Sequence, residues 1–378
     1  MNILIAPDSY KESLTSIQVS KYIKKGILNV SKEHNITLIP LADGGEGTVN
    51  SIISATDGKI INKKVIGPLG KKVNAHFGIT NNGKTAVIEM ASASGLQLIP
   101  LDKRDPSITT TYGTGQLIKE ALSYDIEDII IGIGGSATND AGVGLAQALG
   151  VKFLDKDNND IEFGGRNLNK IKKIDIANTD PRIKNVDIKV ACDVNNPLYG
   201  LNGAAYIYSP QKGADPKMVK VLDENLRYFN SIVKKQLDMN LNKIKGAGAA
   251  GGLGAGLIAF LNAKLYNGIE LILDIVEFDH YVKDVDLVIT GEGMLDGQSV
   301  NGKTPVGVAR RSKKYGKPVL AIVGSLGKDV NNVLDEGIDS YYPIIDKPDS
   351  LKSIMNRSQE LLINTTEQII RTINIFNK

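Results

Sequence analysis

Both ends of this 378-residue chain alternate short, continuous apolar runs with amphipathic segments, and this order restricts the fold more than any other feature. Apolar runs cover residues 2–6 and 36–41, and the same strand and helix order returns over residues 286–375. Continuous apolar runs are typical of strands buried on both faces, and their alternation with helices is typical of a parallel sheet. We therefore expect a doubly wound α/β domain of five parallel strands, assembled from residues 1–66 and 284–378.

Residues 67–283 have a different pattern. The segments 72–80 and 84–90 flank Asn-Asn-Gly, which is a hairpin signal, so antiparallel pairing is expected there. Residues 151–154 and 186–191 predict further strands. Residues 217–237 carry apolar side chains at helical spacing and predict a long amphipathic helix. This region is therefore expected to form a mixed-sheet α/β domain inserted into the first domain, and the cleft between the domains is the default ligand site.

The composition excludes several classes of protein. The net charge is only +3 and the lysines are scattered, which argues against a nucleic-acid partner. The single cysteine, Cys192, rules out an intramolecular disulfide and suits a reducing compartment. Residues 1–7 are too short an apolar run for a signal peptide, and the uncharged stretch 246–263 is too rich in glycine to span a membrane. We expect a cytoplasmic protein with no membrane partner, for which a homo-oligomer is possible.

A strand, a glycine turn and a helix are expected in succession over residues 128–150. Gly134 and Gly135 end the apolar run, and the next residues include several that favour the first turn of a helix. Unpaired N–H groups at such a turn can bind a phosphate, so we interpret it as an anion-binding loop. A tight connection without a ligand is the alternative. A second alternative is a dinucleotide-binding fingerprint. Residues 132–137 fit the motif G-x-G-x-x-A, and Asp155 follows at the distance usual for the acidic residue that binds the ribose.

Two other glycine-rich segments compete with this loop. Residues 297–304 fit the P-loop pattern G-x-x-x-x-G-K-T, but residues 291–296 separate them from the preceding strand. Pro305 also follows where a helix should be running, so a true P-loop is not expected. Residues 246–256 contain six glycines and predict either a close-packed backbone crossing or a mobile lid.

Carboxylates follow most of the expected strands and lie beside glycine, serine or asparagine. They are Asp8, Asp43, Glu46, Asp193, Glu292 and Asp296. Turn and capping roles could explain each of them singly. As a set they suit Mg²⁺, which takes one or two carboxylates together with phosphate oxygens. The three histidines lie outside every polar or glycine cluster, so a catalytic base is expected to be an aspartate.

With these segments in view, the chain resembles the type-1 glycerate kinase family of bacteria over almost its whole length. The similarity rests on eight segments in order: APDSYKESLTS (6–16), PLADGGEGT (40–48), EMASASGLQL (89–98), TTYGTGQLI (110–118), GIGGSATNDAG (132–142), ACDVNNPLYG (191–200), GAGAAGGLGAGL (246–257) and TGEGMLDGQSVNGKTPVGVA (290–309). The resemblance implies an ATP- and Mg²⁺-dependent kinase that converts D-glycerate to 2-phosphoglycerate. It also implies a fold of two α/β domains, one of which is a discontinuous Rossmann-like or flavodoxin-like domain.

Physical arguments then assign provisional roles. Asp193 is the first choice for the base, and Lys11, Asp43 and Asp296 complete the catalytic set, with Asp43 and Asp296 as Mg²⁺ ligands. The residues expected to bind the nucleotide phosphates are Gly134, Gly135, Ser136, Thr138, Asn139 and Lys303. Glycerate is assigned to Asp8, Ser9, Gly44, Gly45, Glu46, Gly47 and Asn196. The alternatives are a nicotinamide-dependent dehydrogenase and a non-catalytic small-ligand binding protein, which would explain fewer of these carboxylates.

Overall fold

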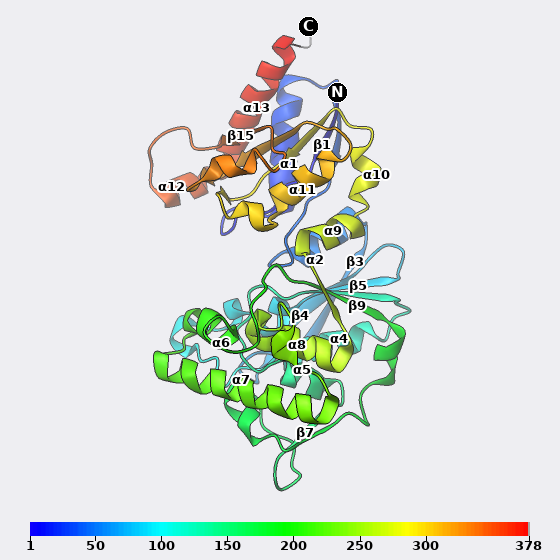
Figure 1. The fold of residues 1–378 in the computed structure, drawn as a ribbon. Helices are drawn as coiled ribbons and strands as arrows, with labels where there is room; N and C mark the ends of the chain where they lie inside the picture. Colours follow the sequence, from blue (N-terminus) through cyan, green and yellow to red (C-terminus); the bar gives the residue numbers. More distant parts are fainter. Residues whose placement is uncertain (377–378) are drawn as a thin grey trace. The chain divides into compact units, whose positions relative to one another are not determined.

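The computed structural model describes residues 1–376, which form two compact units. The first unit contains residues 1–43 and 50–57 and the chain from residue 267 onward, so it holds both the blue N-terminal strand and the red C-terminal helix of Figure 1. The second unit contains residues 44–49 and 58–266. Among the described residues, no helix is both long and apolar enough to cross a lipid bilayer.

The first unit is built on a parallel five-stranded sheet in the order β15-β13-β11-β1-β2. Its strands are β1 (Asn2–Ile5), β2 (Asn35–Leu38), β11 (Leu287–Thr290), β13 (Val319–Val323) and β15 (Ser340–Pro343). The central strand β1 pairs with β11 in the register Ile3↔Leu287, so the two ends of the chain share one sheet. The expected doubly wound sheet of five parallel strands is therefore confirmed.

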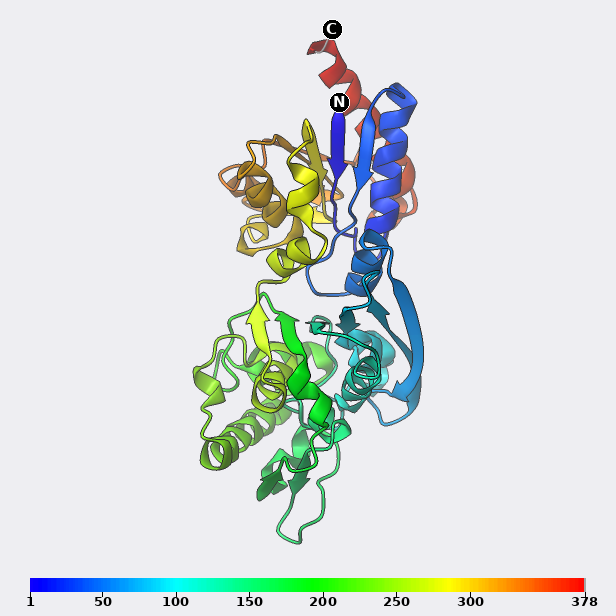
Figure 2. The same cartoon turned by 90° about the vertical axis from the view of Figure 1, so that its right-hand side faces the viewer.

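Helices cover both faces of this sheet (Figure 2). They are α1 (Ser16–Val30), α2 (Thr48–Ala55), α9 (Gly268–Ile275), α10 (Phe278–Val282), α11 (Thr304–Lys313), α12 (Leu351–Asn356) and α13 (Ser358–Phe376). Ile3 and Ile5 pack in one cluster with the apolar sides of α1 and α13, which lie side by side. Because side chains alternate along a strand, the buried Leu4 points to the opposite face. Short elements complete the unit: β12 (Met294–Leu295), β14 (Ser325–Leu326) and the 3₁₀ turns η7 (Ser299–Asn301) and η8 (Val330–Val333).

The second unit contains a mixed six-stranded sheet in the order β10-β9-β6-β5-β4-β3. Its strands are β3 (Lys59–Ile66), β4 (Lys72–Ile79), β5 (Thr85–Glu89), β6 (Asp128–Gly132), β9 (Asp187–Ala191) and β10 (Lys264–Tyr266). The pairs β3–β4 and β4–β5 are antiparallel, as the hairpin signal predicted, and the remaining pairs are parallel. The helices are α3 (Met90–Ser94), α4 (Tyr112–Ala121), α5 (Val143–Ala148), α6 (Ala204–Tyr208), α7 (Pro216–Leu237) and α8 (Ala249–Leu261).

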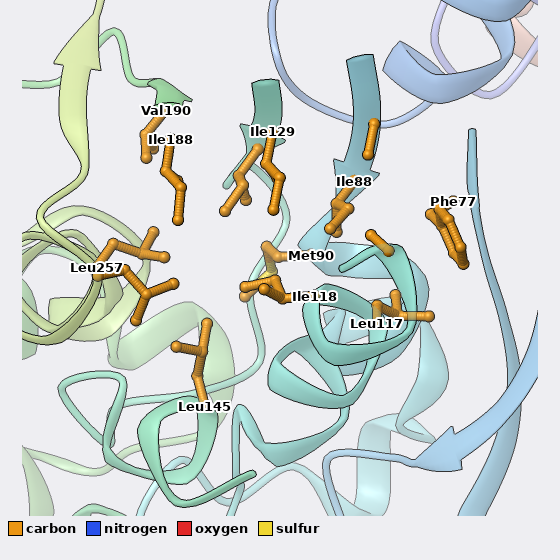
Figure 3. Close-up of a cluster of buried hydrophobic side chains, with 14 of the residues drawn as sticks. Phe77, Ile88, Met90, Leu117, Ile118, Ile129, Leu145, Ile188, Val190 and Leu257 are labelled. Atoms are coloured by element: carbon orange, nitrogen blue, oxygen red, sulfur yellow. The ribbon is translucent and has the colours of Figure 1, made fainter. Parts of the chain in front are cut away.

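The core of the second unit lies between this sheet and the helices packed on it (Figure 3). Strand residues such as Ile88, Ile129 and Val190 face Leu117 and Leu257 from the helices. A second cluster gathers around the apolar side of α7, where the predicted long helix is confirmed. These two cores fix the loops that follow β5, β6 and β9. Several of the polar residues that the sequence suggested as binding or catalytic residues lie in these loops.

Two local expectations need revision. The strand expected at residues 151–154 exists as β7 (Lys152–Leu154), but it pairs with β8 (Lys173–Asp175) in a separate small sheet. Asp155 there accepts N–H groups of residues 157 and 159 and so stabilises a hairpin turn. This removes it from the place where a dinucleotide ribose would need it. The segment expected as a helix near residue 330 is only the 3₁₀ turn η8.

The glycine-rich segment 246–256, which includes the start of α8, is a close-packed backbone crossing. Gly251 has φ +71°, and a Cβ atom there would lie 1.9 Å from the carbonyl oxygen of Thr138. Only glycine fits this contact, which holds the segment against the loop that follows β6.

The two units group some residues differently from the expected domains. Residues 58–66 belong to the second unit because β3 pairs along its whole length with β4. Residues 267–283 belong to the first unit because α9 and α10 pack against α11. Domain limits near residues 66 and 284 stay a proposal.

Candidate active site

A cavity of about 420 Å³ lies at the carboxyl ends of the strands in the first unit. A lining residue follows each of the five strands: Asp8 after β1, Asp43 after β2, Glu292 after β11, Gly324 after β13 and Ile344 after β15. Ligands of open parallel sheets bind at this edge, and the volume lies within the usual range for small-molecule sites. This cavity, called the strand-end pocket below, is the candidate active site.

Asp8 is the most perturbed carboxyl group of the strand-end pocket. Burial and the neighbouring charges of Asp43 and Glu292 raise its pKa to about 7, although hydrogen bonds oppose the shift. Its Oδ2 atom accepts a hydrogen bond from the Thr304 hydroxyl at 2.7 Å, and its Oδ1 atom accepts the Ser9 N–H at 2.6 Å. Three carboxyl groups therefore share a poorly solvated space in which a cation would relieve their repulsion.

A second polar group in this unit links Glu292, Asp296 and Lys303. The Ser299 hydroxyl donates to Glu292 Oε1 at 2.6 Å, and Lys303 Nζ lies 3.5 Å from both Glu292 Oε2 and Asp296 Oδ1. Asp296 Oδ1 also accepts the N–H groups of residues 298 and 299, so it stabilises the turn that precedes Lys303. Burial raises the pKa of Glu292, while Ser299 and Lys303 oppose the shift.

The P-loop-like segment ends at the start of a helix, as phosphate-binding segments do, but it does not follow a strand of the main sheet. Lys303 is the N-cap residue of α11, and Pro305 lies in the first turn. Proline is favoured there because its missing N–H would be unpaired in any case, so Pro305 starts the helix instead of interrupting it. Lys303 thereby lines the strand-end pocket at the positive end of a helix.

The loop after β1 places Ser9 and Lys11 in the same pocket. The Tyr10 hydroxyl donates to the carbonyl oxygen of Ile322 at 2.7 Å, and the Leu14 N–H donates to the Tyr10 carbonyl oxygen. These bonds fix a compact loop and leave the Lys11 side chain exposed at the pocket. A cation held in this way can contact an anionic ligand.

In the second unit, the loop Gly44–Gly47 is fixed by a buried carboxyl group. Glu89, at the end of β5, accepts the Gly47 N–H at 3.0 Å, and the N–H groups of Thr48 and Val49 also point to it. The Gly47 amide, expected to bind substrate, is therefore engaged within the protein. Burial raises the pKa of Glu89 to about 7 despite these donors.

The raised pKa of Glu89 predicts a pH-dependent stability. Its folded-state pKa is above the ordinary 4.5, so its stabilising contribution is complete below pH 4.5 and is lost as the pH rises toward 7. The loss is at most about 3 kcal/mol. Glu89→Gln should remove this part of the pH slope, as measured by urea unfolding at pH 5 and pH 8. Glu224→Gln, at an exposed glutamate of α7 in the same unit, is the control, and equal slopes for wild type and Glu89→Gln would contradict the expectation.

The loop after β6 forms more hydrogen bonds with the rest of the protein than the sequence indicated. Lys212 is buried, and its Nζ atom donates to the Ser136 hydroxyl at 2.6 Å and to the Thr138 carbonyl oxygen at 2.7 Å. Thr138 and Asn139 are fully buried, and the Asn139 amide donates to the Ser209 hydroxyl. Burial lowers the pKa of Lys212 to about 7. The side chains of Thr138 and Asn139 thus face the protein interior, and a bound phosphate could reach only the backbone and Ser136.

Asp140 has the helix-capping role in this loop. Its carboxylate accepts the N–H groups of Gly142 and Gly144 at the start of α5. It also accepts both the N–H and the hydroxyl of Thr111. The polar cluster after the glycines therefore orders the connection between β6 and α5.

The segment after β9 presents Asp193 at the surface of the second unit. Asn196, which was expected to bind substrate, is engaged through both ends of its side-chain amide. It donates to the carbonyl oxygen of residue 202 and accepts from the Tyr208 hydroxyl at 2.6 Å. Asp193 is thus the residue of this segment with an exposed carboxylate.

The structure brings Asp8, Ser9, Lys11, Asp43 and Lys303 together in the strand-end pocket. The loops at residues 44–47 and 134–139, together with Asp193 and Asn196, belong to the second unit. Sequence reasoning missed the supporting residues Thr304, Ser299, Glu89 and Lys212. Of these, only the Thr next to Lys303 in the P-loop-like pattern carried a recognisable signal.

Comparisons with known proteins agree over the whole chain. The sequence profile of the glycerate kinase family matches residues 3–374. A glycerate kinase of Haemophilus influenzae is 50% identical over 373 residues, which cover 99% of each chain. A glycerate 2-kinase of Escherichia coli is 49% identical over 375 residues, covering 99% of this chain and 98% of the relative. A crystal structure described as a candidate glycerate kinase 2 from Salmonella typhimurium superimposes with a TM-score of 0.91 at 44% identity, covering 100% of this chain and 99% of that one.

Proposed function

The chain belongs to the glycerate kinase family, and from this premise we propose that it transfers the γ-phosphoryl group of ATP to D-glycerate, giving 2-phosphoglycerate and ADP. The observation that carries the proposal is the strand-end pocket, in which three carboxyl groups face Lys11 and Lys303. Phosphoryl transfer depends mainly on cations that spread the charge of the transferred group. The dehydrogenase alternative loses its support because Asp155 stabilises a turn in a separate small sheet.

The donor set of the pocket fits Mg²⁺. Within residues 1–376, no three carboxylate, imidazole or thiolate groups could enclose a metal ion by themselves. Mg²⁺ in phosphoryl-transfer sites is held by one or two carboxylates together with substrate oxygens, so this is the expected pattern. We propose Asp43 and Asp8 as the holding residues because both line the strand-end pocket, and we assign Asp296, which is not one of its lining residues, to supporting Lys303. When bound, Mg²⁺ would neutralise charge on the phosphate oxygens.

The residues of the chain then have separate tasks. Lys303 and Lys11 stabilise negative charge on the phosphates. In the second unit, Gly135 and Ser136 stay a separate proposal for anion contacts, whereas the Gly134 N–H donates to the Gly44 carbonyl oxygen. Asp193 accepts the proton of the attacking hydroxyl. Ser9 and Lys11, which line the strand-end pocket, bind the glycerate carboxylate. The cytoplasm, suggested by the lone cysteine, stays part of this proposal.

The decisive experiment is a reaction with ATP, Mg²⁺ and D-glycerate, with a control that lacks glycerate. ADP release that depends on glycerate supports the proposal. A folded protein that releases no ADP above the control would refute it. Replacing ATP by NAD in the same reaction tests the dehydrogenase alternative.

The product should be 2-phosphoglycerate. The 2-hydroxyl is separated by fewer bonds from the anchored carboxylate than the 3-hydroxyl, so it is held more rigidly. Orientation of the nucleophile can lower the barrier by up to roughly 7 to 11 kcal/mol. Phosphorus NMR of the product, or a coupled assay with enolase alone, checks this expectation. A requirement for phosphoglycerate mutase before enolase would identify 3-phosphoglycerate instead.

A further inference from the structure

The strand-end pocket has an apolar half in addition to its charged half. Its apolar lining comes from β12, from the end of β15 and from α12, and consists of Met294, Ile344, Ile345, Leu351, Ile354 and Met355. We call these six residues the apolar wall. Three of them are unusually exposed for their type: Leu351 at 73%, Met294 at 50% and Ile345 at 40%. Single exposed apolar residues are common, but several that line one pocket indicate a surface covered by a ligand.

Polar side chains near the apolar wall are directed at the protein. The Ser13 hydroxyl donates to the Ser358 hydroxyl at 2.7 Å, and the Ser358 hydroxyl donates to the Met355 carbonyl oxygen at 2.9 Å. An occupant of this half therefore meets mainly apolar surface. The charged lining residues are Lys11 and Lys303 and four carboxyl groups, those of Asp8, Glu12, Asp43 and Glu292.

A ligand that fills the strand-end pocket must match both its apolar wall and its charged lining residues. Glycerate has three carbons and a polar group on each, so it gains nothing from an apolar wall and leaves most of a 420 Å³ cavity unfilled. A molecule with an anionic end and a flat aromatic end fits, because its ring buries apolar area while its charges reach the lysines. A nucleoside triphosphate has this construction.

We infer that the strand-end pocket binds the donor nucleotide, with the base against the apolar wall and the phosphates toward Lys11 and Lys303. This inference rests on the proposed function for the presence of a nucleotide, and it adds where the base binds. It places base recognition in the first unit. The glycine loop after β6, where the sequence suggested nucleotide contacts, has no part in holding the base.

The test compares two double variants. In the first, Ile345→Ser with Leu351→Ser removes two exposed side chains of the apolar wall. In the control, Leu334→Ser with Ile375→Ser removes two comparably exposed side chains of the same unit that do not line the pocket. All four positions are exposed, so both proteins should fold, and circular dichroism would verify this.

Binding of ADP and of tripolyphosphate is measured by calorimetry without glycerate. The wall variant should bind ADP about tenfold more weakly, because the base loses apolar contact, and should bind tripolyphosphate as tightly as the wild type does. The control variant should match the wild type for both ligands. In steady-state assays, the wall variant should raise the KM for ATP and leave the KM for glycerate unchanged.

Three results would overturn the inference: unchanged ADP affinity, equal weakening of ADP and tripolyphosphate, or a raised KM for glycerate alone. Failure of the proposed function would look different. The wall variant would then still weaken ADP binding selectively, while the wild-type protein would release no ADP in a glycerate-dependent reaction.

Discussion

Asp193→Asn should lower kcat by roughly 10² to 10⁴ while nucleotide binding is retained. The substitution keeps the size of the side chain and removes the carboxylate that we propose as acceptor of the hydroxyl proton. Asp193 directly follows the segment that leaves β9, and its side chain is exposed, so the change should not disturb the fold. Single-turnover kinetics and ADP binding by calorimetry measure the two effects separately.

Asp157→Asn is a suitable control for this experiment, because Asp157 is also exposed and lies in a turn of the same unit. A near-normal kcat for Asp193→Asn would move the base role to another carboxylate. Asp43 or Asp296 would then be the next candidate.

Lys303→Met should lower kcat/KM by roughly 10² to 10³, the usual cost of removing one group that stabilises transition-state charge. Lys303 lines the strand-end pocket at the N-terminus of α11, with Glu292 and Asp296 each 3.5 Å from its Nζ atom. Methionine keeps the length of the aliphatic chain and removes the charge. Initial rates over a range of ATP concentrations would show whether kcat, KM or both change.

Lys314→Met removes an exposed lysine at the other end of the same helix and serves as the matched control. Equal rates for Lys303→Met and wild type would contradict a role for Lys303 in phosphoryl transfer. A loss confined to KM would instead assign it to ground-state binding of the nucleotide.

The fold could be predicted in segments where the apolar residues keep one regular spacing, that of a strand or that of a helix. Strands β1, β11 and β13 were visible as buried apolar runs, whereas the edge strands β2 and β15 are half-buried or exposed. The Asn-Asn-Gly turn predicted the β4–β5 hairpin. Which strand joins which sheet was not visible, because β7 has the same apolar pattern as a strand of the main sheet but pairs with β8. Pairing depends on contacts distant in sequence, which local patterns do not carry.

The candidate site was predictable as far as residue type and strand position indicate chemistry. Asp8, Asp43 and Lys303 were identified because charged residues in tight turns after strands are conspicuous. Lys212 was not, since nothing around it in the sequence distinguishes a buried lysine from a solvated one. The apolar wall was also missed, because its residues come from three segments that read separately as ordinary strand and helix positions.

The sharing of one sheet by both ends of the chain has a consequence for synthesis on the ribosome. Strand β1 cannot pair with β11 until Leu287 has been made, after nearly all of the second unit. At typical elongation rates of about 5–20 residues per second, that delay is roughly 15 to 60 s. During this time the apolar strand β1 has only β2 beside it, while the second unit is already complete enough to fold. Strand β1 therefore stays without its second neighbour far longer during synthesis than β11, which can pair with β1 as soon as it is made.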